Sequence, residues 1–185
     1  MTYLSTVNLK IGYENSLSSP INFKLPVGEI IQVKGANGSG KSTLLKTLLG
    51  EIPSLGGEIN WLISNKEISY LPQAGMNSHN FNFTLKEFLE TYDVEQEIKQ
   101  YLNPELANRL WVNSSGGERQ LALILTRISK RTKVLILDEP LNHLDIKSRK
   151  LIEDLISELM KKRSNLSIII VSHLEINLPK KELEL

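Results

Sequence analysis

The sequence predicts an α/β fold with a mixed, mainly parallel sheet and antiparallel strands near the N-terminus. Three observations support this fold. A glycine-rich loop at 35–43 lies between an apolar run at 29–34 and a run with helical spacing. A second apolar run, 134–137, ends in two acidic residues. A helical pattern at 146–163 then precedes a third apolar run. Strands that alternate with helices are typical of parallel sheets, and 185 residues suit a single domain.

The N-terminal region contains two predicted strands before the glycine-rich loop. Leu4–Lys10 and Ile21–Leu25 are predicted to pair antiparallel, with Pro20 and Gly28 marking the turns around the second of them. The run Glu29–Lys34 is apolar enough to be a strand of a parallel sheet. The chain therefore enters the glycine-rich loop from a strand.

Residues 35–43 match the phosphate-binding pattern G-x-x-x-x-G-K-[ST], and a helix is predicted from Lys41 to Leu49. Glycines let the backbone approach phosphate closely, and the N–H groups at the start of the helix face the anion. Lys41 reaches the outer phosphates and Ser42 binds Mg²⁺ in such loops. The alternative is a simple glycine-rich turn before a helix. The residues expected to hold the phosphates are Asn37, Gly38, Ser39, Gly40, Lys41, Ser42 and Thr43.

Two short strands and a helical segment are predicted next. The alternation in 57–63 suits a strand, and the strand 68–71 leads to Gln73. Within Thr84–Tyr101, apolar residues recur at helical spacing, which predicts one helix. A further helix is predicted at Gln120–Ser129.

The run Val134–Leu137 reads as a strand that is buried on both faces and that delivers Asp138 and Glu139 at its end. Ligands bind at this edge of α/β sheets. One acid is expected to hold the Mg²⁺ shell and the next to position or deprotonate a water molecule. Adjacent strand residues point to opposite faces, so the two acids are expected to have different roles. The alternative is an acidic turn that ends at Pro140.

The last helix is predicted over Ile146–Arg163, where six apolar side chains form one stripe. Asp145 is predicted to cap its N-terminus. The apolar strand Ile168–Val171 follows and leads to His173. An imidazole at the end of a strand can donate a hydrogen bond to phosphate.

Composition narrows the class of protein. The 22 basic and 21 acidic residues nearly cancel, which argues against direct nucleic-acid binding. The absence of cysteine excludes disulfides and thiolate chemistry. The N-terminus does not resemble a signal peptide, and no apolar run approaches the roughly 20 residues that a membrane span needs.

Four motifs occur in a characteristic order: the phosphate-binding loop, Ser114–Glu118 with the sequence Ser-Ser-Gly-Gly-Glu, the acidic pair before Pro140, and His173. In this order they resemble the ATP-binding cassette (ABC) ATPases, which have a P-loop NTPase fold, and the resemblance covers nearly the whole chain. It implies a core formed by 1–73 and 114–185, with a helical subdomain at 74–113. The expected ligands are ATP and Mg²⁺.

The resemblance also implies a role for each matching residue. Asp138 matches the acid associated with Mg²⁺, Glu139 the general base, and His173 the switch histidine at the γ-phosphate. Gln73 matches the glutamine that contacts Mg²⁺ and the attacking water. Tyr13 matches the aromatic residue that stacks on adenine. Ser115, Gly116 and Gly117 match the signature loop that binds ATP held by the opposite subunit, and Asp145 matches the D-loop acid.

Simpler interpretations of these residues stay open. Gln73 could be an ordinary loop residue, and His173 a histidine without a partner. Ser115 could act only as a helix cap. Tyr13 could pack a hairpin, as could the nearby Tyr3. His143 and His79 are interpreted as surface or loop residues. Two positions depart from the usual signature motif: Ser114 stands where Leu is common, and Glu118 where Gln is common.

The resemblance implies the subunit of a membrane transporter that binds and hydrolyses ATP. Two copies are expected to pair head-to-tail around two ATP molecules, most simply as a homodimer. A transmembrane permease subunit is the second expected partner, which would place the chain in the cytoplasm at the inner face of the cell membrane. The alternatives are a soluble ABC ATPase similar to the ABC-F translation factors and a regulatory cassette that hydrolyses little ATP.

Overall fold

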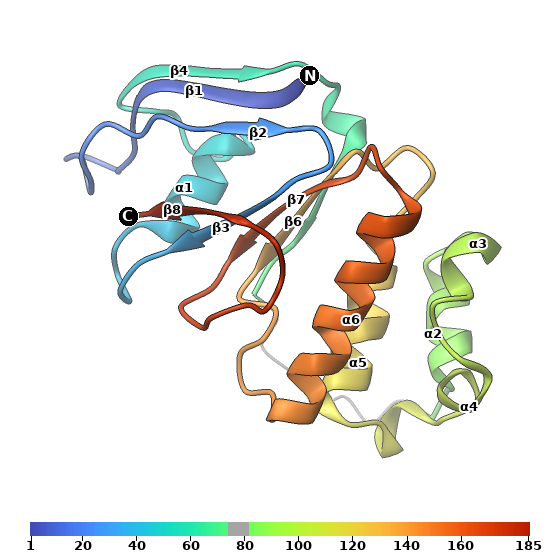
Figure 1. The fold of residues 1–185 in the computed structure, drawn as a ribbon. Coiled ribbons are helices and arrows are strands. Elements are labelled where there is room, and N and C mark those ends of the chain that lie inside the picture. The colour runs from blue at the N-terminus through green and yellow to red at the C-terminus, as the bar shows by residue number, and fades with distance from the viewer. Residues whose placement is uncertain (74–81) are drawn as a thin grey trace.

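A computed structural model of the chain describes residues 1–73 and 82–185. Its elements form layers (Figure 1). An antiparallel sheet lies at one side, helix α1 (Lys41–Leu48) lies between it and a parallel sheet, and the longer helices cover the other face of the parallel sheet. The predicted α/β class is confirmed.

Among residues 1–73 and 82–185 the larger sheet has five strands, and every pairing between them is parallel. Their order is β5-β6-β7-β3-β8, so the strand before the phosphate loop, β3, lies beside the histidine strand β7, and β7 separates it from the acidic strand β6. The bounds are Ile68–Leu71 for β5, Val134–Asp138 for β6, Ser167–Val171 for β7, Ile30–Lys34 for β3 and Lys181–Glu184 for β8. This order brings the three functional loops to the same edge.

The smaller sheet is antiparallel, as predicted, and contains β1 (Thr2–Lys10), β2 (Lys24–Pro26) and β4 (Gly56–Trp61) in the order β2-β1-β4. The β1–β4 pairing shifts register between Val7 and Lys10. At this bulge Gly57 has φ +80°, and a Cβ there would lie 2.3 Å from the Asn8 carbonyl oxygen. Gly57 is therefore required by both backbone conformation and space.

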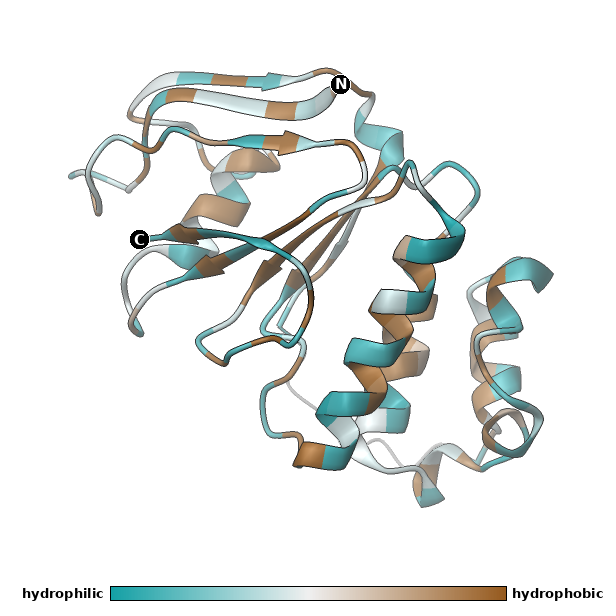
Figure 2. Cartoon of the chain, in the orientation of Figure 1, coloured by the Kyte–Doolittle hydropathy of each residue, from teal (hydrophilic) through white to brown (hydrophobic). Residues whose placement is uncertain are grey.

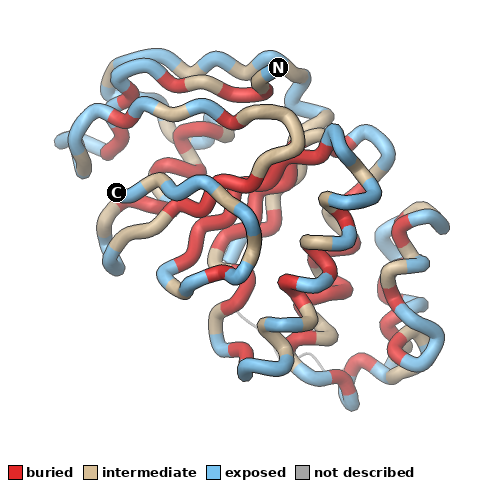
Figure 3. The backbone as a smooth tube through the Cα atoms, in the orientation of Figure 1, coloured by how far each residue is buried: buried red, intermediate tan, exposed pale blue. Residues whose placement is uncertain are grey.

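The parallel sheet separates two hydrophobic clusters, because successive side chains of each strand point to opposite faces. In β6, Leu135 and Leu137 pack toward the helices α5 (Gly116–Leu125) and α6 (Ile146–Lys162), whereas Val134 and Ile136 pack toward α1. Figure 2 shows these strands as strongly hydrophobic, and Figure 3 shows them as buried. Burial on both faces explains the uninterrupted apolar runs in the sequence.

The segment 82–113 is helical, but it is not one long helix. It contains α2 (Leu85–Thr91), α3 (Gln96–Lys99), α4 (Pro104–Ala107) and the 3₁₀ turn η2 (Trp111–Asn113). The prediction of a single helix over Thr84–Tyr101 is wrong. Asp93 has φ +51° and turns the chain after α2, although neither Gly nor Pro marks this position.

Some boundaries also differ from the predictions. Helix α5 begins at Gly116 and ends at Leu125, four residues before the predicted end. Strand β8 is not predicted by the sequence pattern. The 3₁₀ turn η1 (Asn65–Glu67) precedes β5. None of the helices in the described ranges is long and apolar enough to cross a membrane.

Candidate functional site

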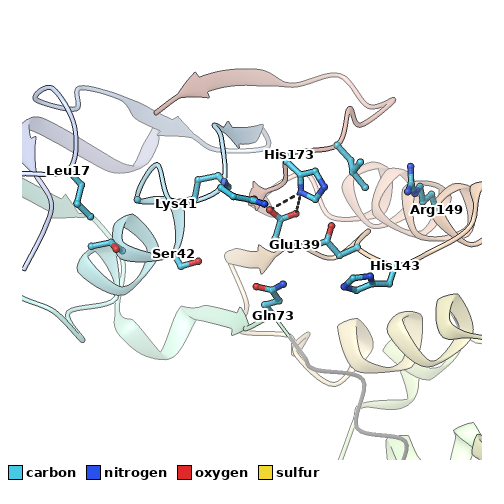
Figure 4. A pocket seen from close by; sticks show the side chains of 14 residues that line it. Leu17, Lys41, Ser42, Gln73, Glu139, His143, Arg149 and His173 are labelled. Carbon is cyan, nitrogen blue, oxygen red and sulfur yellow. Dashed lines mark hydrogen bonds and ion pairs between the residues drawn. The ribbon is translucent and has the colours of Figure 1, made fainter.

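A cavity of about 610 Å³ opens at the edge where β3 and β6 end, together with the loops that follow β5 and β7 (Figure 4). It joins the glycine-rich loop to the acidic strand and to the histidine turn. The lining residues are Leu17, Asn37, Gly38, Gly40, Lys41, Ser42, Thr43, Gln73, Glu139, Asn142, His143, Arg149, His173 and Leu174. Most of the residues predicted to hold phosphate therefore lie around one space.

The start of α1 has the geometry that the predicted phosphate site requires. Its N-cap residue, Gly40, has φ +101° and makes no side-chain capping bond, so the first N–H groups of the helix have no side-chain acceptor. Lys41 is nearly buried, and its Nζ donates to the carbonyl oxygens of Gly35 and Ala36, each at 2.8 Å. These bonds fold the ammonium group back over the loop, where a phosphate oxygen could replace a carbonyl.

The loop also leaves room for a ligand at Gly38. This residue has φ +85°, and apart from its chain neighbours no atom of the described residues lies within 4 Å of the position that a Cβ would take. Ser39 does not line the cavity, and its Oγ is buried without a hydrogen-bond partner among the described residues. A polar ligand in the loop is the simplest partner for such a group.

Asp138 ends β6 and is 5% exposed. Burial raises the pKa of its carboxyl group, while the hydrogen bond from the Tyr70 hydroxyl to Oδ2, 3.3 Å long, acts in the opposite direction. Burial and the neighbouring carboxylate also raise the pKa of Tyr70. Within the described part of the chain, Oδ1 of Asp138 has no partner.

This unpaired oxygen fits the predicted Mg²⁺ site. Mg²⁺ prefers oxygen ligands and commonly takes one or two from the protein together with water and substrate phosphates. Asp138 is not among the residues that line the cavity, but its buried carboxylate ends the adjacent strand; Ser42 and Gln73 provide a hydroxyl and an amide oxygen on the cavity wall. The donor set is therefore of the right chemical kind.

Glu139 and His173 meet in the cavity. The imidazole Nδ1 lies 3.2 Å from Glu139 Oε1 and 3.1 Å from Oε2, and Figure 4 shows the two side chains pointing toward each other. The Glu139 side chain is 8% exposed, whereas that of His173 is 44% exposed. Glu139 has φ +50°, and its N–H donates to the Val171 carbonyl oxygen, which ties the end of β6 to β7.

Several lining residues were not predicted. Leu17, Arg149 and Leu174 border the cavity but belong to no predicted motif, and Asn142, the first residue of the segment that matches the D-loop, was given no contact with the nucleotide. His143 was interpreted as a surface or loop residue; it is exposed, yet it also lines the cavity. His79 lies outside the described residues. No sequence signal identifies these additional lining residues, because their place at the cavity depends on the tertiary structure.

The signature residues lie elsewhere. Ser115 caps α5: its side chain accepts from the Glu118 N–H, and Glu118 Oε2 accepts from the Ser115 N–H at 2.8 Å. Ser115, Gly116 and Gly117 do not line the cavity. Gly117 packs closely on α6, because a Cβ there would lie 2.5 Å from Cβ of Ser148. The cap interpretation of Ser115 is confirmed.

The two departures in this motif have structural explanations. Ser114 is nearly buried, and its hydroxyl donates to the Leu110 carbonyl oxygen at 2.9 Å. Glu118 completes the cap of α5, and its Oε1 also accepts from Arg109 at 2.6 Å. Arg109 in turn contacts Glu105 of α4 at 2.8 Å. The polar side chains at both positions therefore make hydrogen bonds within the chain.

Asp145 and Tyr13 also lie outside the cavity lining. Asp145 caps α6, as predicted, with Oδ1 accepting from the Ser148 N–H at 2.7 Å, and this bond lowers the pKa of its carboxyl group. Tyr13 is 66% exposed, so its ring is free to stack on a ligand, and the stacking role stays a prediction. Tyr3 is nearly buried and donates its hydroxyl proton to Asn165 O.

Comparison with known proteins agrees with this geometry. The family model described as ABC transporter matches residues 18–142. The chain is 36% identical to an ABC transporter ATP-binding protein of Haemophilus influenzae, with 92% of this chain and 74% of the relative aligned. It is 34% identical to the molybdate import ATP-binding protein MolC of the same organism, over 92% of this chain and 72% of the relative.

A solved structure extends the similarity to three dimensions. An inward-facing metal-chelate type ABC transporter matches with a TM-score of 0.76 and 30% identity, covering 94% of this chain and 74% of that chain. The shared fold and the matched sequence lead to one conclusion: the chain belongs to the ABC transporter family of ATP-binding proteins.

Proposed function

We propose that the chain is the ATP-binding and ATP-hydrolysing subunit of an ABC membrane transporter. One observation carries this proposal. A single cavity contains a phosphate-binding loop on one wall and the Glu139–His173 pair on another. Phosphoryl transfer depends on positioning and charge stabilisation, and these two walls provide both.

ATP would bind with its phosphates over the start of α1. The free N–H groups and Lys41 would hold the outer phosphates, and Tyr13 would stack on the base. Asp138, Ser42 and Gln73 would hold Mg²⁺. The ion, when bound, neutralises charge on the phosphate oxygens.

Glu139 is suited to act as the general base. Its carboxylate would accept a proton from the attacking water as the water oxygen bonds to the γ-phosphorus and the bond to the bridging oxygen of ADP breaks. His173 would orient Glu139 in the absence of nucleotide and donate a hydrogen bond to the γ-phosphate when ATP is present. The 3.1 Å contact between the two side chains supports this shared role.

The signature residues would complete the site of a second copy. Ser115, Gly116 and Gly117 lie outside the cavity of their own chain; Ser115 is exposed, whereas Gly117 is buried. A head-to-tail dimer would bring the start of α5 against the ATP of the partner, with Asp145 near the same interface. Contacts made only when ATP is bound would close the dimer.

A transmembrane permease is the proposed second partner, docking near Gln73 and the proposed helical subdomain 74–113. The chain would then lie at the inner face of the cell membrane. The named relative MolC supports import as the direction of transport. It aligns over 72% of its own length, which favours a transporter subunit over a soluble ABC-F-like factor.

ATP turnover by the native chain and by Glu139→Gln tests this proposal. We expect the native chain to hydrolyse ATP and the variant to bind ATP, lose at least about 100-fold in kcat and accumulate as a dimer. Oligomeric state is measured with and without ATP and Mg²⁺. Equal turnover by both proteins would refute the role of Glu139. Lack of turnover by the native chain, with the permease supplied, would refute the function.

A further inference from the structure

Gln32 is an unusual residue in the centre of the parallel sheet. It is fully buried in β3, between Ile31 and Val33, and its register partners are Ile170 of β7 and Glu182 of β8. Burying an amide in apolar surroundings is unfavourable unless it makes hydrogen bonds that compensate. The buried carboxamide is therefore expected to have a hydrogen-bond partner.

That partner is the turn that carries His173. Gln32 Nε2 donates to the Leu174 carbonyl oxygen at 2.7 Å and lies 3.5 Å from the Ser172 carbonyl oxygen. These two carbonyls flank His173 in the sequence. Only the NH₂ group of the amide can donate to a carbonyl, so the orientation of the amide is fixed.

The oxygen of the same amide is not stabilised by the fold. Gln32 Oε1 has no hydrogen-bond partner among residues 1–73 and 82–185. An apolar side chain of the same size would avoid this unsatisfied acceptor. The contact to the histidine turn is thus the benefit that the glutamine brings.

Other contacts also lie on this turn: the Ser172 N–H donates to the Val33 carbonyl oxygen at 3.2 Å, and the Leu174 N–H donates to Ser172 Oγ at 3.0 Å. Lys34 pairs with Glu175 at 2.6 Å, and Lys180 Nζ donates to the Ile176 carbonyl oxygen at 2.7 Å. Glu153 accepts from the Asn177 N–H at 2.9 Å. The last three contacts fix residues 175–177, whereas the Gln32 side chain reaches the two carbonyls beside His173 from within the sheet.

We propose that Gln32 is a positioning residue for His173, holding the backbone on both sides of the histidine so that its imidazole points at Glu139. The inference rests on the proposed function, in which this pair serves ATP hydrolysis. Gln32 does not line the cavity and is fully buried. It acts through the turn.

The test replaces Gln32 with methionine, which has similar volume and no amide donor. Ser167→Ala is the matched control. Ser167 is also fully buried, and its hydroxyl donates to the Pro26 carbonyl oxygen at 2.8 Å, but it lies at the opposite end of the sheet. If Gln32→Met does not fold, Gln32→Leu replaces it. Thermal unfolding establishes that each variant is folded.

NMR of the histidine ring signals is the first measurement. The chain has three histidines, and His173→Ala assigns the signal of interest. At constant pH and without nucleotide, we expect Gln32→Met to move the His173 ring signal by more than its line width, and Ser167→Ala to leave it in place. An unmoved signal in Gln32→Met would overturn the proposal whatever the kinetics.

Steady-state kinetics is the second measurement. We expect Gln32→Met to lower kcat by about 10-fold and to change KM for ATP by less than about twofold, because misplacing a reacting group slows the chemical step. In a His173→Ala background the same substitution should cause no further loss. A full additional 10-fold loss there, or unchanged kcat in the single variant, would contradict the proposal.

The two measurements separate this inference from the proposed function. If the native chain and its permease show no ATP turnover, the proposed function fails. The ring signal of His173 still shows whether Gln32 sets its position, because that measurement needs no turnover.

Discussion

Replacing Asp138 with asparagine should stabilise the nucleotide-free protein while removing its response to ATP and Mg²⁺. Asp138 is 5% exposed, its Oδ1 has no partner in the described part of the chain, and the bond to Oδ2 from Tyr70 is long at 3.3 Å. A carboxylate in this environment is poorly compensated. Such strain is expected where a residue is retained for ligand binding and not for stability.

The magnitude follows from these contacts. An unsatisfied buried polar group costs about 1–3 kcal/mol, and a charged one costs more. The amide of asparagine removes the charge but leaves one polar group buried, so the net gain should be near the lower end. We expect the free energy of unfolding to rise by about 1 kcal/mol at pH 7, which corresponds to about 2–4 °C in Tm for a chain of this size.

The gain should depend on pH. Burial raises the pKa of Asp138 above its ordinary value of 3.8. Between the ordinary pKa of 3.8 and the higher pKa in the folded state, the folded chain binds more protons than the unfolded chain. The native protein therefore loses stability as pH rises through this window. Asparagine does not titrate. The advantage of Asp138→Asn should therefore be complete above the folded-state pKa and should fade as pH falls toward 3.8.

Thermal unfolding across this pH range, with and without ATP and Mg²⁺, provides the assay. ATP should raise the Tm of the native protein by mass action and leave that of Asp138→Asn nearly unchanged. Asp154→Asn is the control, since Asp154 is exposed, pairs with Lys150 on the surface and should contribute less than about 0.5 kcal/mol. A variant that is less stable than the native protein at every pH would refute the reasoning.

Three further substitutions test the fold. Ser115→Ala removes the cap of α5 and should lower the free energy of unfolding by about 1 kcal/mol, measured by urea denaturation; no change would contradict the cap. Gly57→Ala places a Cβ 2.3 Å from the Asn8 carbonyl oxygen at φ +80° and should cost about 2–3 kcal/mol in the same assay; a neutral effect would disprove the bulge. Lys180 and Lys34 hold the pKa of Glu175 at about 2, so its contribution to stability is present above its ordinary pKa of 4.5 and is lost as pH falls toward 2. Glu175→Gln should flatten this acid limb of stability in a pH series of thermal unfolding, and an unchanged limb would exclude Glu175 as its cause.

The buried strands could be predicted from sequence because burial on both faces leaves uninterrupted apolar runs. Strand β5 has the predicted bounds Ile68–Leu71. Strand β8 could not be predicted, because Lys-Glu-Leu-Glu is a charged edge strand whose partner β3 lies about 150 residues earlier in the chain. The break after α2 was missed because Asp93 adopts a left-handed conformation that its sequence context does not mark.

The candidate site divides in the same way. Residues in motifs, such as Lys41 and Glu139, were predicted because their spacing carries the chemistry. Leu17 and Arg149 line the same cavity only because the fold brings them there. Gln32 shows most clearly what the sequence does not reveal. In the sequence it only interrupts an apolar strand, whereas in the fold its amide donates to the carbonyl oxygen of Leu174, 142 residues later.

Glu118 links two parts of the molecule that the sequence keeps apart. One carboxylate oxygen closes the cap that begins α5, and the other holds Arg109, which also contacts Glu105 of α4. The contact between Arg109 and Glu118 is well shielded on the Glu118 side, where exposure is 12%. Helix α4 and the start of α5 are thus connected through the Arg109 and Glu118 side chains. Any displacement of α4 would carry Ser115 with it, so a push on the helical segment from outside would be transmitted to the residues proposed to meet the ATP of a second copy.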